Sequence, residues 1–140
     1  MQSVEEFMRE YFNARSTEIK NEIYRRSIFR SKYFCDKCRW DSRHCAVERS
    51  DSEIIENVSK SGAETRIITR DISPFPRLCY HLINAGERWV IKNVDVECVN
   101  CFGTVGNTAC IVCLGNGWLQ QQDYIETVKR VLNGETMGGY

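Results

Sequence analysis

Four cysteines in the C-terminal third of the chain constrain its fold more than any other feature. They form two Cys-x2-Cys pairs, Cys98 with Cys101 and Cys110 with Cys113, and two glycines lie in the spacer between the pairs. The x2 spacing turns both sulfur atoms of a pair to the same side, and the spacer lets the two pairs fold onto each other. The four thiolates are therefore predicted to bind one Zn²⁺ in a tetrahedral structural site. Two disulfides or an iron–sulfur cluster are the alternatives.

The composition is that of one ordinary globular domain. The 140 residues are 42% hydrophobic and 27% charged, and 19 basic side chains balance 19 acidic ones. This balance gives no net field toward nucleic acid or an anionic membrane, so we expect neither as a partner. The chain starts without the pattern of a signal peptide and has no apolar run of the ~18 residues that span a bilayer. We therefore expect a cytoplasmic protein whose eight cysteines are thiols or metal ligands.

Two helices are predicted before any strand. Ser3 and Glu6 form a capping box, and apolar residues then recur at helical spacing over residues 4–15. After a break at residues 15–17, a second helix is predicted over residues 18–34. Bulky aromatic residues on such elements either pack in the core or line a ligand cavity. The cavity candidates, with one histidine from a later strand, are Tyr11, Tyr24, Tyr33, Trp40 and His81.

A basic segment with three more cysteines begins near the end of the second helix. Residues 25–43 hold seven positive side chains against two negative ones. A solvated helix face is the usual meaning of such a run, and an acidic or phosphate-rich partner is the alternative. Ligand types for a second metal site also occur here, at Cys35, Cys38, His44 and Cys45. Because only one Cys-x2-Cys pair is present, buried or idle thiols are the preferred interpretation, ahead of a metal or a catalytic cysteine paired with the histidine.

From residue 53 onward the apolar period changes from helical to alternating, which predicts an antiparallel sheet. Four strands are expected, at residues 53–58, 65–70, 77–84 and 88–98. The first two form a hairpin around a turn at residues 60–63. The apolar phase of the last strand switches at Lys92 and Asn93, which predicts a β-bulge.

A terminal helix is predicted after the cysteines. Asp123 and Glu126 form a second capping box, apolar residues follow at helical spacing, and Gly134 ends the helix.

The hairpin over residues 80–94, Tyr-His-Leu-Ile-Asn-Ala-Gly-Glu-Arg-Trp-Val-Ile-Lys-Asn-Val, follows two helices and resembles a late hairpin of the nuclear-transport-factor-two-like superfamily. The resemblance covers roughly residues 3–98 and implies a cone-shaped domain in which a curved sheet wraps a long helix. The superfamily contains isomerases, dehydratases and polyketide cyclases, non-catalytic binding and dimerisation domains, and immunity proteins of toxin systems. Because dimerisation is common in this superfamily, the resemblance also implies a possible homodimer. The fold alone does not settle the function.

The cysteine loop carries a separate resemblance. Its units Cys98-x2-Cys-Phe-Gly and Cys110-x2-Cys-Leu-Gly-Asn-Gly are similar to the repeats of DnaJ-type cysteine-rich domains, which implies zinc binding. This chain has two such units, whereas a DnaJ region has four and binds two ions.

Together these patterns predict the α+β class: two N-terminal helices packed on a curved, cone-shaped antiparallel sheet, then a four-cysteine zinc loop and a C-terminal helix. Residues 1–97 would form the cone, 98–118 the zinc loop, and 119–140 the helix and tail of one compact domain. The leading interpretation is a zinc-stabilised, non-catalytic domain that binds an unidentified protein or small molecule, because four cysteines leave no open position on the metal. The alternatives are an isomerase-, dehydratase- or cyclase-type enzyme that uses the cone cavity, and an immunity protein that neutralises a bacterial toxin.

Overall fold

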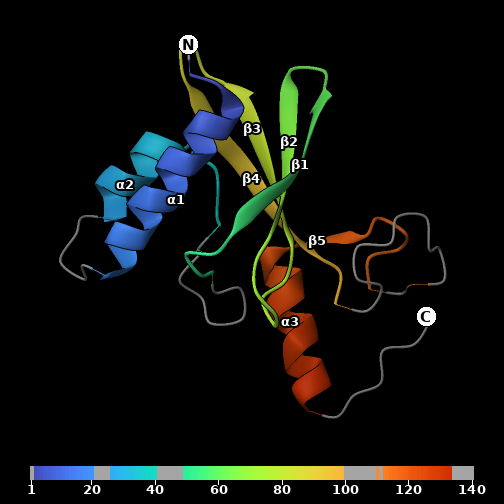
Figure 1. The fold of residues 1–140 in the computed structure, drawn as a ribbon. Helices are drawn as coiled ribbons and strands as arrows, with labels where there is room; N and C mark the ends of the chain where they lie inside the picture. The colour runs from blue at the N-terminus through green and yellow to red at the C-terminus, as the bar shows by residue number, and fades with distance from the viewer. Residues whose placement is uncertain (1, 21–25, 41–48, 100–109, 111, 134–140) are drawn as a thin grey trace.

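A computed structural model describes residues 2–20, 26–40, 49–99, 110 and 112–133 of the chain. The helices and strands in these ranges follow the order α1 (Val4–Lys20), α2 (Arg26–Tyr33), β1 (Ile54–Ser61), β2 (Glu64–Arg70), β3 (Leu78–Asn84), β4 (Trp89–Glu97), β5 (Trp118–Gln120) and α3 (Gln121–Leu132) (Figure 1). The predicted α+β class, the antiparallel sheet and the C-terminal helix are confirmed.

The five strands form one antiparallel sheet in the order β1-β2-β3-β4-β5. The predicted hairpin is present as β1 and β2, and Gly62 in its turn has a φ of 66°, a conformation that glycine adopts without a Cβ penalty. The last strand, β5, was not predicted from the sequence. It is only three residues long, so it shows no alternation, and it pairs with β4 by placing Leu119 opposite Val96.

The predicted bulge in β4 is confirmed. In the register with β3, Ile91 pairs with Leu82 and Asn93 pairs with His81, which leaves Lys92 as the extra residue. Because the side chains of a regular strand alternate between its two faces, this extra residue lets Ile91 and Val94 both reach the core. Their side chains are 0% and 2% exposed.

The boundaries of the first two helices differ from those predicted. α1 begins at the predicted cap, where the Glu6 N–H donates to Ser3 Oγ at 3.1 Å, but it continues to Lys20 through the break expected at residues 15–17. That break was wrong because Arg15 is buried by tertiary contacts that hold the helix together. α2, Arg26–Tyr33, lies within the helix predicted over residues 18–34, of which residues 18–20 belong to α1 and residues 21–25 lie outside the described ranges.

The second capping box is also wrong. α3 starts at Gln121, directly after β5, and its N-cap Gln120 makes no side-chain cap hydrogen bond. Asp123 lies inside the first turn instead, where its carbonyl accepts a hydrogen bond from Thr127 Oγ1 at 2.8 Å. The strand enters the helix without a loop, so no separate capping residue precedes it.

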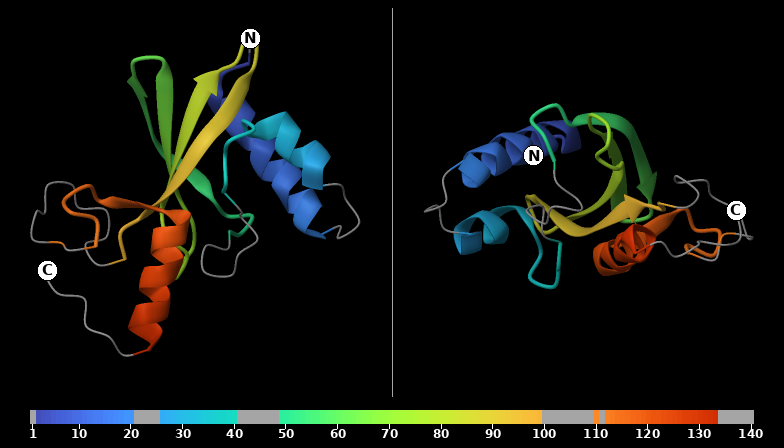
Figure 2. Two further views of the ribbon diagram at one scale, coloured as in Figure 1. Left: turned by 180° about the vertical axis from the view of Figure 1, so that it is seen from behind. Right: turned by 90° about the horizontal axis from the view of Figure 1, so that it is seen from below.

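The helices lie on different parts of the sheet. α1 and α2 lie side by side along one face, while α3 lies away from them and contacts β4 and β5 (Figures 1 and 2). Tyr11 of α1 and Tyr80 of β3 are both fully buried, and their ring centroids are 5.9 Å apart. A bridge between Phe34 and Ile91 joins the end of α2 to β4. In the described ranges, no helix combines the length and apolarity needed to cross a bilayer.

Candidate functional site

Three of the four predicted zinc ligands meet where β4 ends. Cys98 follows β4 directly, and its N–H donates to the Gly117 carbonyl at 2.9 Å, which draws the two ends of the cysteine loop together. The Sγ atoms of Cys98, Cys110 and Cys113 all lie within 4.8 Å of one another, and those of Cys98 and Cys110 are 3.7 Å apart. Sulfur atoms bound to one tetrahedral zinc at ~2.3 Å are ~3.8 Å from each other, so this spacing fits the ion. Cys101 lies outside the described residues.

The local sequence explains how the second cysteine pair reaches this position. The Leu114 N–H donates to the Cys110 carbonyl at 3.0 Å, which closes a turn around Cys113. Leu114, Gly115 and Gly117 then adopt positive φ values of 55°, 88° and 88°. The two glycines allow this reversal, and the chain returns to β5 within a few residues. All three described cysteines of the cluster are buried, as expected of a structural metal site.

The second predicted metal site is not assembled by the described residues. The Cys35 thiol donates to the Lys92 carbonyl at 3.5 Å, and burial raises the pKa of the Cys38 thiol. Within the described ranges, neither cysteine belongs to a group of three or more metal-ligating side chains. His44 and Cys45 lie outside those ranges. The contacts of Cys35 and Cys38 are those of ordinary thiols, the interpretation preferred from the sequence.

The predicted cavity-lining residues separate into different environments. Tyr11 and Tyr33 pack in the core, where they are 0% and 3% exposed and their ring centroids are 5.7 Å apart. Tyr24 lies outside the described residues. Trp40 does line a cavity. His81 lies on the face of β3 opposite the buried Tyr80, because side chains alternate along the strand.

His81 is held between two carboxylates. Its Nε2 lies 2.8 Å from Asp95 Oδ2 on β4, and its Nδ1 contacts Glu64 on β2. Partial burial opposes protonation of the imidazole, but the hydrogen bond to Asp95 and the neighbouring acceptors outweigh it and raise the pKa of His81 to about 10. The side chain is therefore an imidazolium cation at neutral pH.

A buried ionic cluster joins α1, the segment before β1, and the sheet. Glu53 lies at its centre, 2.7 Å from Arg15 Nη1 and 3.0 Å from Arg49 Nη2, and it accepts hydrogen bonds from Tyr80 at 2.9 Å and from Thr69. Burial opposes the charge of Glu53, yet the two guanidinium groups outweigh it and hold the pKa of this carboxyl below its ordinary value. Sequence reasoning missed this Glu53 cluster, because its members are scattered along the chain and show no spacing pattern.

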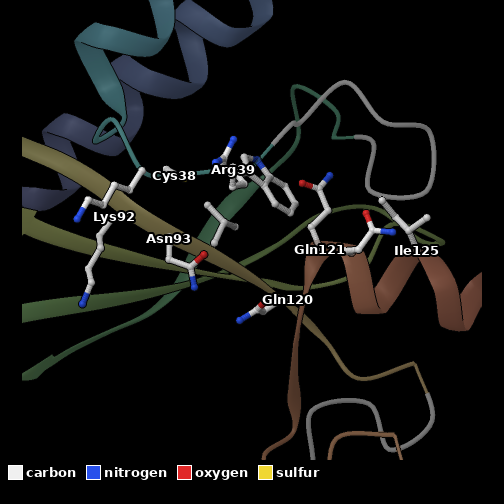
Figure 3. Close-up of a pocket in the computed structure, with 11 residues that line it drawn as sticks. Cys38, Arg39, Lys92, Asn93, Gln120, Gln121 and Ile125 are labelled. Atoms are coloured by element: carbon white, nitrogen blue, oxygen red, sulfur yellow. The ribbon is translucent and has the colours of Figure 1, made fainter.

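A cavity of about 530 Å³ lies between residues 37–40, β4 and the start of α3. Figure 3 shows Cys38 and Arg39 on one side and Gln121 and Ile125 on the other, with Asn93 of β4 beside them. Among the described residues, the lining includes three bases and no acid: Lys37, Cys38, Arg39, Trp40, Lys92, Asn93, Val94, Gln120, Gln121, Gln122 and Ile125. Two of the bases belong to the basic segment recognised in the sequence, and that segment and the cavity candidate Trp40 are the sequence signals that pointed toward this cavity.

Comparisons of the chain with protein-family models, with curated proteins and with solved structures find no match. The function of the chain therefore has to be inferred from the geometry of its own sites.

Proposed function

We propose that the chain is a zinc-stabilised, non-catalytic domain that binds a small molecule. The observation that carries the metal assignment is the convergence of three buried thiols, Cys98, Cys110 and Cys113, at the end of β4. Cys101 would be the fourth ligand, because it forms the Cys-x2-Cys pair with Cys98. A tetrahedron filled by four thiolates leaves no position for water or substrate, so the ion would hold the chain and perform no Lewis-acid chemistry.

The place of the cluster in the fold suggests what the ion stabilises. The cysteine loop connects β4 to β5, and β5 leads directly into α3. The ladder between β4 and β5 consists of only three residue pairs. Such a short ladder supplies few hydrogen bonds, and a metal that cross-links both ends of the loop would fix the position of β5 and α3.

The titratable groups support binding rather than acid–base catalysis. The imidazole of His81 is held charged by two carboxylates, so it is a poor general base near pH 7. Three hydrogen bonds, from Arg49, Thr69 and Tyr80, meet at Glu53 Oε2, and the Arg15 guanidinium lies 2.7 Å from Oε1. Tyr11 is packed among other aromatic rings of the core. These arrangements favour the non-catalytic interpretation over an isomerase, dehydratase or cyclase.

We also propose that the sheet and the first two helices form a cone of the nuclear-transport-factor-two-like type. Two features support this: α1 and α2 lie along one face of the sheet, and the bulge at Lys92 disturbs the long strand β4. An experimental structure whose sheet is flat over that face would remove the proposal.

The metal assignment is tested by the Cys110→Ser variant. We expect the native chain, dialysed against a weak chelator, to keep one zinc per molecule and the variant to lose it. Its free energy of unfolding should fall by about 4 kcal/mol, the class of loss produced when a structural metal is removed. Cys35→Ser is the matched control, since Cys35 lies outside the sulfur cluster, and it should retain zinc. Full zinc content in Cys110→Ser would remove this residue from the site, and a metal-free native chain would remove the proposal.

A further inference from the structure

We propose that the cavity between residues 37–40, β4 and the start of α3 binds a small organic anion, such as an aromatic carboxylate or a phosphate ester. This inference rests on the proposed binding function and names its ligand class. It does not depend on zinc, because none of the three predicted metal ligands that the structure describes, Cys98, Cys110 and Cys113, lines the cavity. We call this space the α3 cavity.

The charge of the lining favours an anion. Lys37, Arg39 and Lys92 contribute positive charge, and no aspartate or glutamate is among the lining residues that the structure describes. The Lys92 ammonium lies 3.5 Å from Glu64, which partly neutralises it. Lys37 and Arg39 are exposed and have no ion-pair partner within the described part of the chain. Unpaired cations beside a partly enclosed space attract and hold an anionic group.

The start of α3 adds to this field. Gln121 and Gln122 occupy the first turn of the 12-residue helix and line the cavity. The N-cap Gln120 makes no side-chain cap hydrogen bond, so its side chain leaves the backbone N–H groups at the positive end of the helix without a cap. Asp123 also lies in the first turn, but it is exposed and is not part of the lining. Backbone N–H groups at such an end commonly bind phosphate or carboxylate oxygens.

An independent observation comes from Trp40. The residue is only 3% exposed and forms part of the cavity wall. Its indole Nε1–H is buried and has no hydrogen-bond partner in the described ranges. Buried N–H groups are normally paired with an acceptor. After a small movement of the indole ring, an oxygen atom of a bound ligand would supply the acceptor that Trp40 lacks among the described residues.

The remaining lining defines the body of the ligand. Trp40, Val94 and Ile125 provide apolar surface, and the side-chain amides of Asn93 and Gln120 provide both donors and acceptors. A volume of about 530 Å³ lies within the usual range of small-molecule sites. The combination suits a compact molecule with an apolar or aromatic part and one anionic head group.

The test compares two fluorescent probes that share an aromatic body. 1-Anilinonaphthalene-8-sulfonate carries an anionic group, and N-phenyl-1-naphthylamine lacks it. We expect the anionic probe to bind with one-to-one stoichiometry, more tightly than the neutral probe, and to weaken as salt is raised. The Lys37→Gln/Arg39→Gln double variant should bind the anionic probe roughly tenfold more weakly and the neutral probe unchanged. Lys60→Gln, an exposed charge on β1, is the matched control and should bind both probes as the native chain does.

Every result other than those expected would overturn a defined part of the proposal. Equal binding of both probes, or an unaffected double variant, would overturn the anion assignment and leave a neutral small-molecule site. Failure of both probes to bind would overturn the small-molecule function as well. Zinc content, measured on the same samples, reports on the metal centre separately. Competition by phenyl phosphate against benzoate then identifies the preferred head group, and failure of both to displace the probe would also overturn the assignment.

Discussion

Glu53 shows how a single residue can be central to the fold without being recognisable in the sequence. It lies at the start of the first predicted strand, where an acidic residue is unremarkable. In the structure its side chain is 1% exposed and contacts two guanidinium groups from different segments. A carboxylate can be buried this deeply only when charge partners and hydrogen bonds replace its hydration. Arg15, which ends up buried on α1 for the same reason, was wrongly placed in a helix break.

The Glu53→Gln variant is expected to be strongly destabilised. It would leave Arg15 and Arg49 buried without their common counter-charge, and breaking a buried pair in this way typically costs about 3–5 kcal/mol. Urea unfolding followed by circular dichroism measures the loss. Glu56→Gln is the matched control: Glu56 contacts Arg77 at the surface, so its loss should cost about 1 kcal/mol or less. Equal effects of the two substitutions would show that the Glu53 cluster contributes no special stability.

Among the elements, the regular strands could be predicted and the irregular junctions could not. In β2 the buried residues Thr65, Ile67 and Thr69 alternate with more exposed ones, and the change of apolar phase in β4 revealed its bulge. β5 and the first turn of α3 leave no such trace. Their residues Trp118–Gln122 pass from strand to helix without a turn, so the position of the junction is set by the pairing of Leu119 with Val96.

The three central strands, β2, β3 and β4, hold a group of charged side chains that should make the folded chain less stable as the pH rises above neutral. His81 on β3 is bonded to Asp95 on β4 and to Glu64 on β2, and its pKa is raised from 6.5 to about 10. Between these two values the folded chain binds a proton that the unfolded chain releases. The stabilisation is therefore complete below pH 6.5 and is lost as pH rises toward 10. After allowance for solvent screening, we expect about 1–2 kcal/mol.

NMR titration of the His81 ring measures this directly. Its midpoint should lie near pH 10 in the native chain. It should fall in Asp95→Asn, which replaces the charged carboxylate acceptor by a neutral amide. The His81→Gln variant provides the stability control. It should lose less stability than the native chain between pH 7 and pH 9, because lysine, tyrosine and cysteine titrations are common to both. A midpoint near 6.5 would contradict the arrangement.

At the scale of the whole molecule, the sequence predicts local elements better than the sites that distant segments build together. The cysteine cluster was predictable because the Cys-x2-Cys spacing places its members in one stretch of sequence. The α3 cavity was not, since its walls come from residues 37–40, 92–94 and 120–125. The basic segment gave a partial signal through Lys37 and Arg39, but only the packing of α3 near that segment turns two surface charges into a site.

Zinc removal should loosen one part of the molecule before the rest. β5 is joined to β4 by three residue pairs, whereas β3 pairs along its whole length with strands on both sides. Without the ion, residues 118–132 would depend on that short ladder and on the apolar contacts of Tyr124 and Ile125. Hydrogen exchange followed by mass spectrometry should therefore show faster exchange in this segment after chelation, by roughly tenfold for each 1.4 kcal/mol lost, and little change in β3. Added zinc should restore the protection. If chelation accelerated exchange equally in both segments, the metal would be holding the entire domain, and the division between a self-sufficient sheet and a metal-dependent C-terminal segment would have to be abandoned.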